Sequence, residues 1–302
     1  MKHPFRTLAI TALFCVLGAP LATGEIIFLY NKSNLSTQLV RIDSATPGTI
    51  LGSVGLTGFP GADNFLFGID FRPADGLLYG RSGDGGVNGT TVQINTTTGA
   101  MTAIGGPTAN GGGSFYGFDF NPLVDRIRLV SDADNNRRFN PNDGAVLVDS
   151  NLAYAAADAN FGANPGVTQV AYTNNVPGAL STTLYGIDFT TDTLVTIIPP
   201  NNGTLNTVGS LGVNVPNFGG FDISGATGTA YAVFLVNNIS GLYTINLATG
   251  GATFLGAIGD GSLAFEGLSV QPTPQTGVPE PSSFALIGLG TLMLAALRNR
   301  RS

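Results

Sequence analysis

The sequence predicts an all-β fold, a β-propeller of five four-stranded blades, followed by a single C-terminal helix. Three observations predict it. A strand motif recurs about every 50 residues, each repeat holds four short alternating segments, and the first repeat lacks a strand that is found at the far end of the body. Gly (43) and Pro (17) supply turns, and a hydrophobic fraction of 43% is enough to build a core.

One strand motif marks each repeat. It reads Gly-Ile-Asp-Phe at residues 68–71 and recurs around Asp119 and Asp222, with weaker copies around Ala171 and Leu268. Counted from the aspartate of the first copy, successive centres are 49, 52, 51 and 46 residues apart. We expect this strand to be the innermost one of each blade.

Three further strands follow the motif in each repeat, split by Gly, Asn or Asp turns such as Thr98-Gly99. In the complete repeats, second strands begin near residues 77, 126, 183 and 229, third strands near 92 and 242, and fourth strands near 101 and 252.

The first repeat predicts how the ring closes. Residues 26–30, 38–43 and 49–54 supply its second, third and fourth strands, and residues 265–270 supply the missing first strand. Pairing between the two ends of the body leaves no open edge on the closing blade. A six-bladed ring is the alternative, if residues 146–175 contain additional strands.

The two ends of the chain are predicted to be targeting segments. Residues 1–24 have the order of a signal peptide, with Lys2 and Arg6 before an apolar stretch and small residues at 22–24. The propeller then spans 25–272. A Pro-rich spacer at 273–281, a transmembrane helix at 282–297 and a basic cytoplasmic tail at 298–302 complete the chain.

The tail closely resembles the PEP-CTERM protein-sorting signal of Gram-negative bacteria. The resemblance rests on a Pro-Glu-Pro motif, an apolar segment and an arginine cluster in that order: Val278, Pro279, Glu280, Pro281, Arg298, Arg300 and Arg301. It implies an exosortase-type sorting enzyme as partner, anchoring in the inner membrane before processing, and then a place at the cell surface or in an extracellular polysaccharide matrix. A plain C-terminal membrane anchor is the alternative.

The body resembles a bacterial domain of unknown function, number 4394. The resemblance is carried first by residues 117–122, 124–132 and 136–141, and then by 171–175, 183–188 and 199–209. It spans roughly residues 27–270 and implies no activity.

Residue counts exclude several functions. The only His and Cys, His3 and Cys15, lie in the predicted signal peptide, so the exported chain lacks an imidazole base, a thiolate nucleophile and the usual zinc ligands. Lys32 is then its only lysine. Five of the 13 basic residues lie in the terminal segments, which leaves 8 against 19 acidic ones, so binding to nucleic acid is not predicted.

Asp70, Asp119 and Asp222 occupy the same place in three copies of the motif. If they point into the central channel, their carboxylates form a ring that binds a cation or acts as acid and base on a sugar. The alternative is that each accepts hydrogen bonds from a neighbouring turn, repeated because the blade is repeated.

Two further clusters are candidate sites. Asp132, Asp134 and Asn136 place oxygen ligands at alternate positions, as in a loose calcium loop, although the pattern is not an EF-hand; an ordinary Asn/Asp turn is the alternative. Arg126 and Arg128 share one strand face and suit a carboxylate or uronic acid; the alternative is pairing with nearby acidic residues, Asp125, Asp132 and Asp134.

The sequence therefore predicts an exported, non-enzymatic propeller that is a structural or binding component of an extracellular polysaccharide matrix. No catalytic residue and no cofactor is predicted, with calcium left open. A carboxylate-based glycan-active enzyme and a calcium-stabilised adhesin are the alternative functions.

Overall fold

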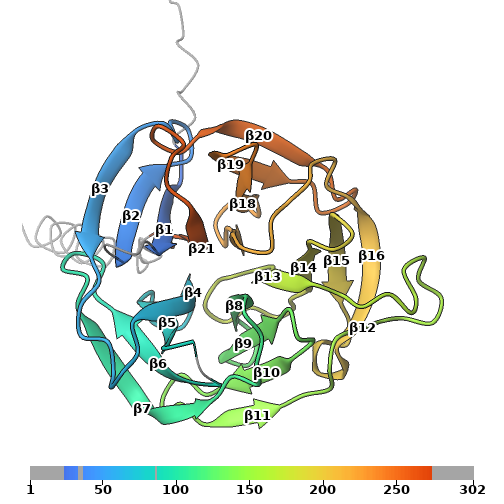
Figure 1. Cartoon of the computed structure of the whole chain (residues 1–302), viewed down its shortest axis with the longest axis horizontal. Coiled ribbons are helices and arrows are strands. Elements are labelled where there is room, and N and C mark those ends of the chain that lie inside the picture. Colours follow the sequence, from blue (N-terminus) through green and yellow to red (C-terminus); the bar gives the residue numbers. More distant parts are fainter. Residues whose placement is uncertain (1–23, 33–36, 86, 274–302) are drawn as a thin grey trace, which may run out of the picture.

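The chain folds as a five-bladed β-propeller, as predicted (Figure 1). The computed structural model describes residues 24–32, 37–85 and 87–273. Within them the only helical element is a short 3-10 turn, η1 (Pro200–Asn202). The strands are separated by turns with Gly, Asn or Asp in the left-handed region, as the composition predicts.

Each blade is one sheet, and its strands follow one another from the channel outwards. Blade 1 contains β21 (Phe265–Val270), β1 (Ile26–Lys32), β2 (Thr37–Asp43) and β3 (Ile50–Gly55), and blade 2 contains β4 (Phe65–Phe71), β5 (Leu78–Gly83), β6 (Asn88–Ile94) and β7 (Met101–Ala109). Blade 3 contains β8 (Tyr116–Asn121), β9 (Arg126–Ser131), β10 (Asn136–Phe139) and β11 (Val146–Val148). Blade 4 contains β13 (Val167–Tyr172), β14 (Leu184–Asp188), β15 (Thr193–Ile197), β16 (Thr204–Ser210) and β12 (Ala153–Tyr154), and blade 5 contains β17 (Gly220–Ile223), β18 (Ala230–Val236), β19 (Ile239–Ile245) and β20 (Ala252–Ala257).

Blade 1 closes the ring in the predicted way. The last described strand, β21, pairs antiparallel with the first, β1, with Leu29 opposite Leu268. Phe265, Leu268 and Val270 of β21 are buried in a core cluster with Ile27 and Leu29 of β1. The two ends of the ring are therefore held by both backbone pairing and apolar packing.

The six-bladed alternative is wrong. Within residues 146–175, β11 is the outer strand of blade 3, and β12 pairs in parallel with β16 as a fifth strand on the outer edge of blade 4. The third strand of the stretch, β13, is the inner strand of blade 4, so the stretch adds only β12, which at two residues is too short to begin a sheet of its own.

The inner strands approach one another closely around the axis. Gly68, Gly117, Gly220 and Gly267 lie two residues before the aspartate position of the motif. A Cβ added to Gly220 would lie 2.3 Å from the backbone nitrogen of Leu268 in the next blade. Glycine at this level therefore lets the strands converge into a narrow channel.

The predicted terminal segments lie outside the described residues, apart from Gly24 and residue 273. This applies to the signal peptide, the sorting motif, the transmembrane helix and the basic tail. In the part of the chain that the structure describes, no helix has the length and apolar character needed to cross a membrane.

Candidate functional site

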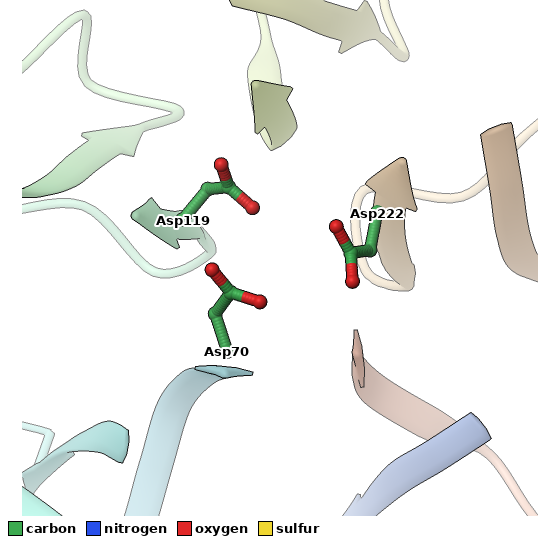
Figure 2. A group of neighbouring side chains, drawn as sticks. All are labelled: Asp70, Asp119 and Asp222. Atoms are coloured by element: carbon green, nitrogen blue, oxygen red, sulfur yellow. The ribbon is translucent and has the colours of Figure 1, made fainter. Parts of the chain in front are cut away.

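Three inner strands bring Asp70, Asp119 and Asp222 together at the axis of the propeller. Figure 2 shows their carboxylates facing one another from β4, β8 and β17. One oxygen from each lies within 4.8 Å of the others. All three residues are at most 1% exposed, so the cluster is buried between the blades.

The aspartates accept backbone N–H groups on the channel edge of the blades, which no strand pairs with. Each inner strand is the last of its sheet, so its channel side has no strand partner. Oδ2 of Asp70 accepts the N–H of Phe120 in the next blade at 2.9 Å. Asp119 does the same for Tyr172 at 2.8 Å, and Asp222 for Val270 at 2.7 Å. The carboxylates thus link neighbouring blades, whereas the alternative prediction had them accept hydrogen bonds from turns.

Ser269 continues this relay in blade 1. Its Oγ accepts the N–H of Phe71 at 3.0 Å and donates to Oδ1 of Asp70 at 2.7 Å. Ser269, and not Leu268, is therefore the counterpart of the aspartates, which corrects the centre assigned to that copy of the motif. In blade 4 the equivalent residue is Ala171, whose side chain cannot accept the N–H of Ile223 in the next blade. That N–H donates to Oδ1 of Asp222 instead, at 2.6 Å.

Burial and mutual repulsion disfavour three negative charges at this place. Desolvation, and then the neighbouring carboxylates, raise the pKa of Asp70 and of Asp119 well above the usual range. Desolvation also raises the pKa of Asp222, to about 6. At an effective dielectric constant of about 20, two charges at such a separation repel by ~3.5 kcal/mol. No arginine or lysine in the described residues forms an ion pair with any of the three.

Polar atoms next to the cluster lack partners. Among the described residues, nothing hydrogen-bonds to either amide atom of Gln169, which is 2% exposed, and Oδ1 of Asp119 accepts no hydrogen bond from a backbone or amide donor. Gln169 lines a cavity of about 10 Å³, which all five inner strands enclose with residues just before the aspartate position. Such a volume holds about one water molecule.

The cluster suits cation binding better than catalysis. Carboxylate oxygens are ligands for hard cations, and three of them converge here. Acid and base catalysis on a glycoside would require a sugar between the carboxylates. In this structure the three carboxylates are at most 1% exposed, and each accepts a backbone N–H.

The structure gives the predicted calcium loop other partners. Oδ1 of Asp132 accepts the N–H of Ser114 at 2.8 Å. Asn136 is 1% exposed, and its Oδ1 accepts a hydrogen bond from Arg128 at 2.6 Å. Oδ1 of Asp134 is buried without a partner among the described side chains and backbone. One of the three predicted ligand oxygens, Oδ1 of Asn136, is therefore already hydrogen-bonded to the guanidinium of Arg128.

The predicted arginine pair does not point to a common ligand. Arg128 is 1% exposed and forms an ion pair with Asp149 at 2.6 Å. Arg138 pairs with the same carboxylate at 2.7 Å. Arg126 donates to the carbonyl of Asp125 at 2.8 Å. Pairing with acidic residues was the expected alternative. The observed partner of Arg128 is Asp149, however, and not Asp125, Asp132 or Asp134.

An aromatic pocket at one end of the channel was not predicted. It has a volume of about 270 Å³ and lies where the inner strands begin. Its aromatic residues are Phe65, Phe67, Phe115, Tyr116 and Phe218, and its charged residues are Lys32 and Glu266. The sequence signal was present, because each of these aromatic residues lies three to five positions before a recurring aspartate.

The pocket has one charge of each sign. Nζ of Lys32 lies 3.6 Å from the ring centroid of Phe65. Burial raises the pKa of Glu266, and Lys32 acts in the opposite direction. The rings of Phe115 and Phe218, from two different blades, are 6.3 Å apart at an interplanar angle of 33°. The pocket therefore combines aromatic faces with polar side chains.

Comparison with models of known families shows which family the chain belongs to. A family model described as "Domain of unknown function (DUF4394)" matches residues 38–269. The chain belongs to this family. The PEP-CTERM protein-sorting motif matches residues 277–301, so the DUF4394 chain carries a signal for export and surface sorting. Both predicted resemblances are confirmed.

Solved structures match the chain at low identity. A chain of a nidogen/laminin complex is 12% identical with a TM-score of 0.49, and the match covers 82% of this chain and 98% of that one. Glutaminyl cyclase from Myxococcus xanthus is 13% identical with a TM-score of 0.43, over 67% and 79%. Among proteins of curated function, none matches the chain.

Proposed function

We propose that this DUF4394 protein is an exported, non-enzymatic propeller that binds polysaccharide and is a component of an extracellular polysaccharide matrix. The observation that carries the proposal is the sorting motif at 277–301, which follows a ring that closes at Val270. An exosortase-type enzyme is the proposed sorting partner. The function of the body is then performed outside the cytoplasm.

The state of the axial carboxylates supports a non-enzymatic role. Each of the three carboxylates accepts a backbone N–H from the following blade, and none is more than 1% exposed. The exported chain has no His or Cys that would replace them as base or nucleophile. Its acidic side chains therefore support the ring rather than a reaction.

The aromatic pocket supports binding of a neutral polysaccharide. Aromatic side chains offer apolar faces with a defined geometry, and Phe115 and Phe218, which precede the inner strands of blades 3 and 5, present two of them. A volume of about 270 Å³ is close to that of small ligand sites, which begin at roughly 300 Å³. The net charge of −6 repels acidic polymers, so we expect neutral ones to bind better.

The test is co-sedimentation of the full chain, in mild detergent, with insoluble neutral and acidic polysaccharides. We expect binding to a neutral polymer, and a loss of at least ~5-fold when Phe115→Ala and Phe218→Ala are combined. Phe161→Ala is the matched control, because Phe161 is 64% exposed and lies outside the pocket. Equal binding by the double variant and the control would contradict the proposed site.

The sorting part has its own test. A chain that ends at residue 276 lacks the matched motif, and we expect it to be lost from the cell surface fraction where the full chain collects. Equal amounts of both chains in that fraction would contradict sorting by the motif.

A further inference from the structure

We propose that Asp70, Asp119 and Asp222 bind one Ca²⁺ ion on the axis of the propeller. The inference goes beyond the proposed function, because the aromatic pocket and the carboxylate cluster are separate sites. It assigns the axial cluster to a metal that links blades 2, 3 and 5 at a single point.

The first support is the arrangement of the ligands. The three oxygens lie within 4.8 Å of one another and come from three different sheets. Ca²⁺ binds oxygen at 2.3–2.6 Å, so three ligands spread evenly around it lie up to about 4.5 Å apart. Side-chain shifts of a few tenths of an ångström, about the scale of that difference, bring the carboxylates to a common Ca²⁺.

The second support is Gln169, which is not part of the acidic cluster. It lies two residues before Ala171, the counterpart of the aspartates in blade 4, so the two side chains share the channel face of β13. Gln169 is 2% exposed, and neither of its amide atoms is paired in the described part of the chain. Buried polar atoms of native proteins are nearly always bonded to protein, water or an ion. An ion at the cluster, through a water ligand in the channel, supplies a partner for Gln169.

The third support is charge. Three carboxylates meet without an arginine or lysine ion pair from residues 24–32, 37–85 or 87–273. A divalent cation neutralises two of the three charges at the point where they converge. Buried charges in proteins are paired or coordinate metals.

The size of the site favours Ca²⁺ over Mg²⁺. Mg²⁺ requires octahedral ligands at 2.0–2.1 Å and usually keeps several of its waters. The cavity enclosed by the residues just before the aspartate position has a volume of about 10 Å³, room for about one water. Ca²⁺ accepts irregular geometry with mostly protein ligands, and extracellular modules bind it at millimolar to submillimolar concentration, as an exported chain requires.

The test uses the full chain in mild detergent, stripped with a chelator and titrated with CaCl₂ or MgCl₂ by calorimetry, with thermal unfolding in parallel. Asp119→Asn removes a charged ligand but keeps an oxygen that can accept the N–H of Tyr172. Asp260→Asn is the control, because Asp260 is an exposed acid bonded to Ser262. We expect one Ca²⁺ per chain, a Tm raised by Ca²⁺, and affinity for Ca²⁺ that falls at least ~10-fold in Asp119→Asn only.

Asp119→Asn also relieves repulsion, so in chelator we expect its Tm to equal or exceed that of the unchanged chain. Three results would overturn the assignment. They are no heat and no Tm shift up to about 10 mM CaCl₂, unchanged Ca²⁺ affinity in Asp119→Asn, and Mg²⁺ binding as tight as Ca²⁺ binding. If Asp119→Asn does not fold, the titration of the unchanged chain and of Asp222→Asn decides by the same criteria.

Discussion

Ser269 gives a direct test of the relay that joins the blades. The substitution Ser269→Ala removes the hydroxyl that accepts the Phe71 N–H, donates to Asp70 and also lies 3.3 Å from Oδ2 of Asp222, and we expect the fold of β21 to stay otherwise unchanged. Ser269 is fully buried, so water does not replace either hydrogen bond without local opening. We expect the ring closure to weaken as a result.

The size of the effect follows from these two contacts. An orphaned buried N–H costs about 1–3 kcal/mol, and a hydrogen bond to a charged group contributes about 1.5–3 kcal/mol. Because the two terms share one hydroxyl and the site relaxes in part, we expect a loss of ~3 kcal/mol in the free energy of unfolding. For a domain of this size that lowers Tm by roughly 6–12 °C.

The assay is urea unfolding and thermal unfolding of the full chain in mild detergent, with chelator and with CaCl₂. Ser262→Ala is the matched control, because Ser262 bonds only to Asp260 on an exposed turn and we expect a change within about 0.5 kcal/mol. If Ser269→Ala and Ser262→Ala shift the unfolding midpoint equally, the relay does not stabilise the ring, and the reasoning from unpaired inner edges fails.

Two further predictions follow from buried charges. Arg128→Met should lower the free energy of unfolding by ~3 kcal/mol, because Asn136 loses its donor while Asp149 keeps a second arginine, Arg138. The control Arg126→Met should lower it by under ~0.5 kcal/mol. Equal urea midpoints for the two variants would contradict this prediction. In chelator, the axial carboxyls of the folded state keep their protons to higher pH than those of the unfolded chain, because their pKa is raised, to about 6 for Asp222. The stability that this proton binding adds is complete below about pH 4 and is lost as pH rises through 6. The Tm advantage of Asp119→Asn over the unchanged chain should therefore grow between pH 4 and pH 7, and an advantage that shrinks would contradict it.

The repeat made the architecture predictable. A motif with regular spacing fixed the number of inner strands, and the incomplete first repeat located the partner of β1 in β21. The weak copy in blade 1 was assigned one residue too early, at Leu268, because a serine there does not look like the aspartate that it replaces. Only the hydrogen bond between Ser269 and Phe71 reveals the equivalence.

Partners across blades and strands were harder to predict. Asp149 lies 21 residues from Arg128 and reaches it through β10 and β11, whose short pairing leaves little sequence signal. The aromatic pocket gathers side chains from the starts of several inner strands, so no local stretch of sequence contains it. The sequence could not supply the path of the chain after β11 in the first case, nor the way the starts of different inner strands meet in the second.

Blade 4 shows why the carboxylates are more than a by-product of repetition. If each aspartate served only its own repeat, the position would be aspartate throughout, yet it is Ser269 in blade 1 and Ala171 in blade 4. Ser269 accepts the N–H of Phe71 without adding a charge. Ala171 has no acceptor, and the N–H of Ile223 donates to Oδ1 of Asp222 instead. Five carboxylates around one axis would add seven more repelling pairs to the three that exist, each worth ~3.5 kcal/mol at similar separation. Hydrogen bonding between blades thus favours an acceptor at every position, while repulsion limits how many can be charged, and three is a number that one divalent cation can compensate.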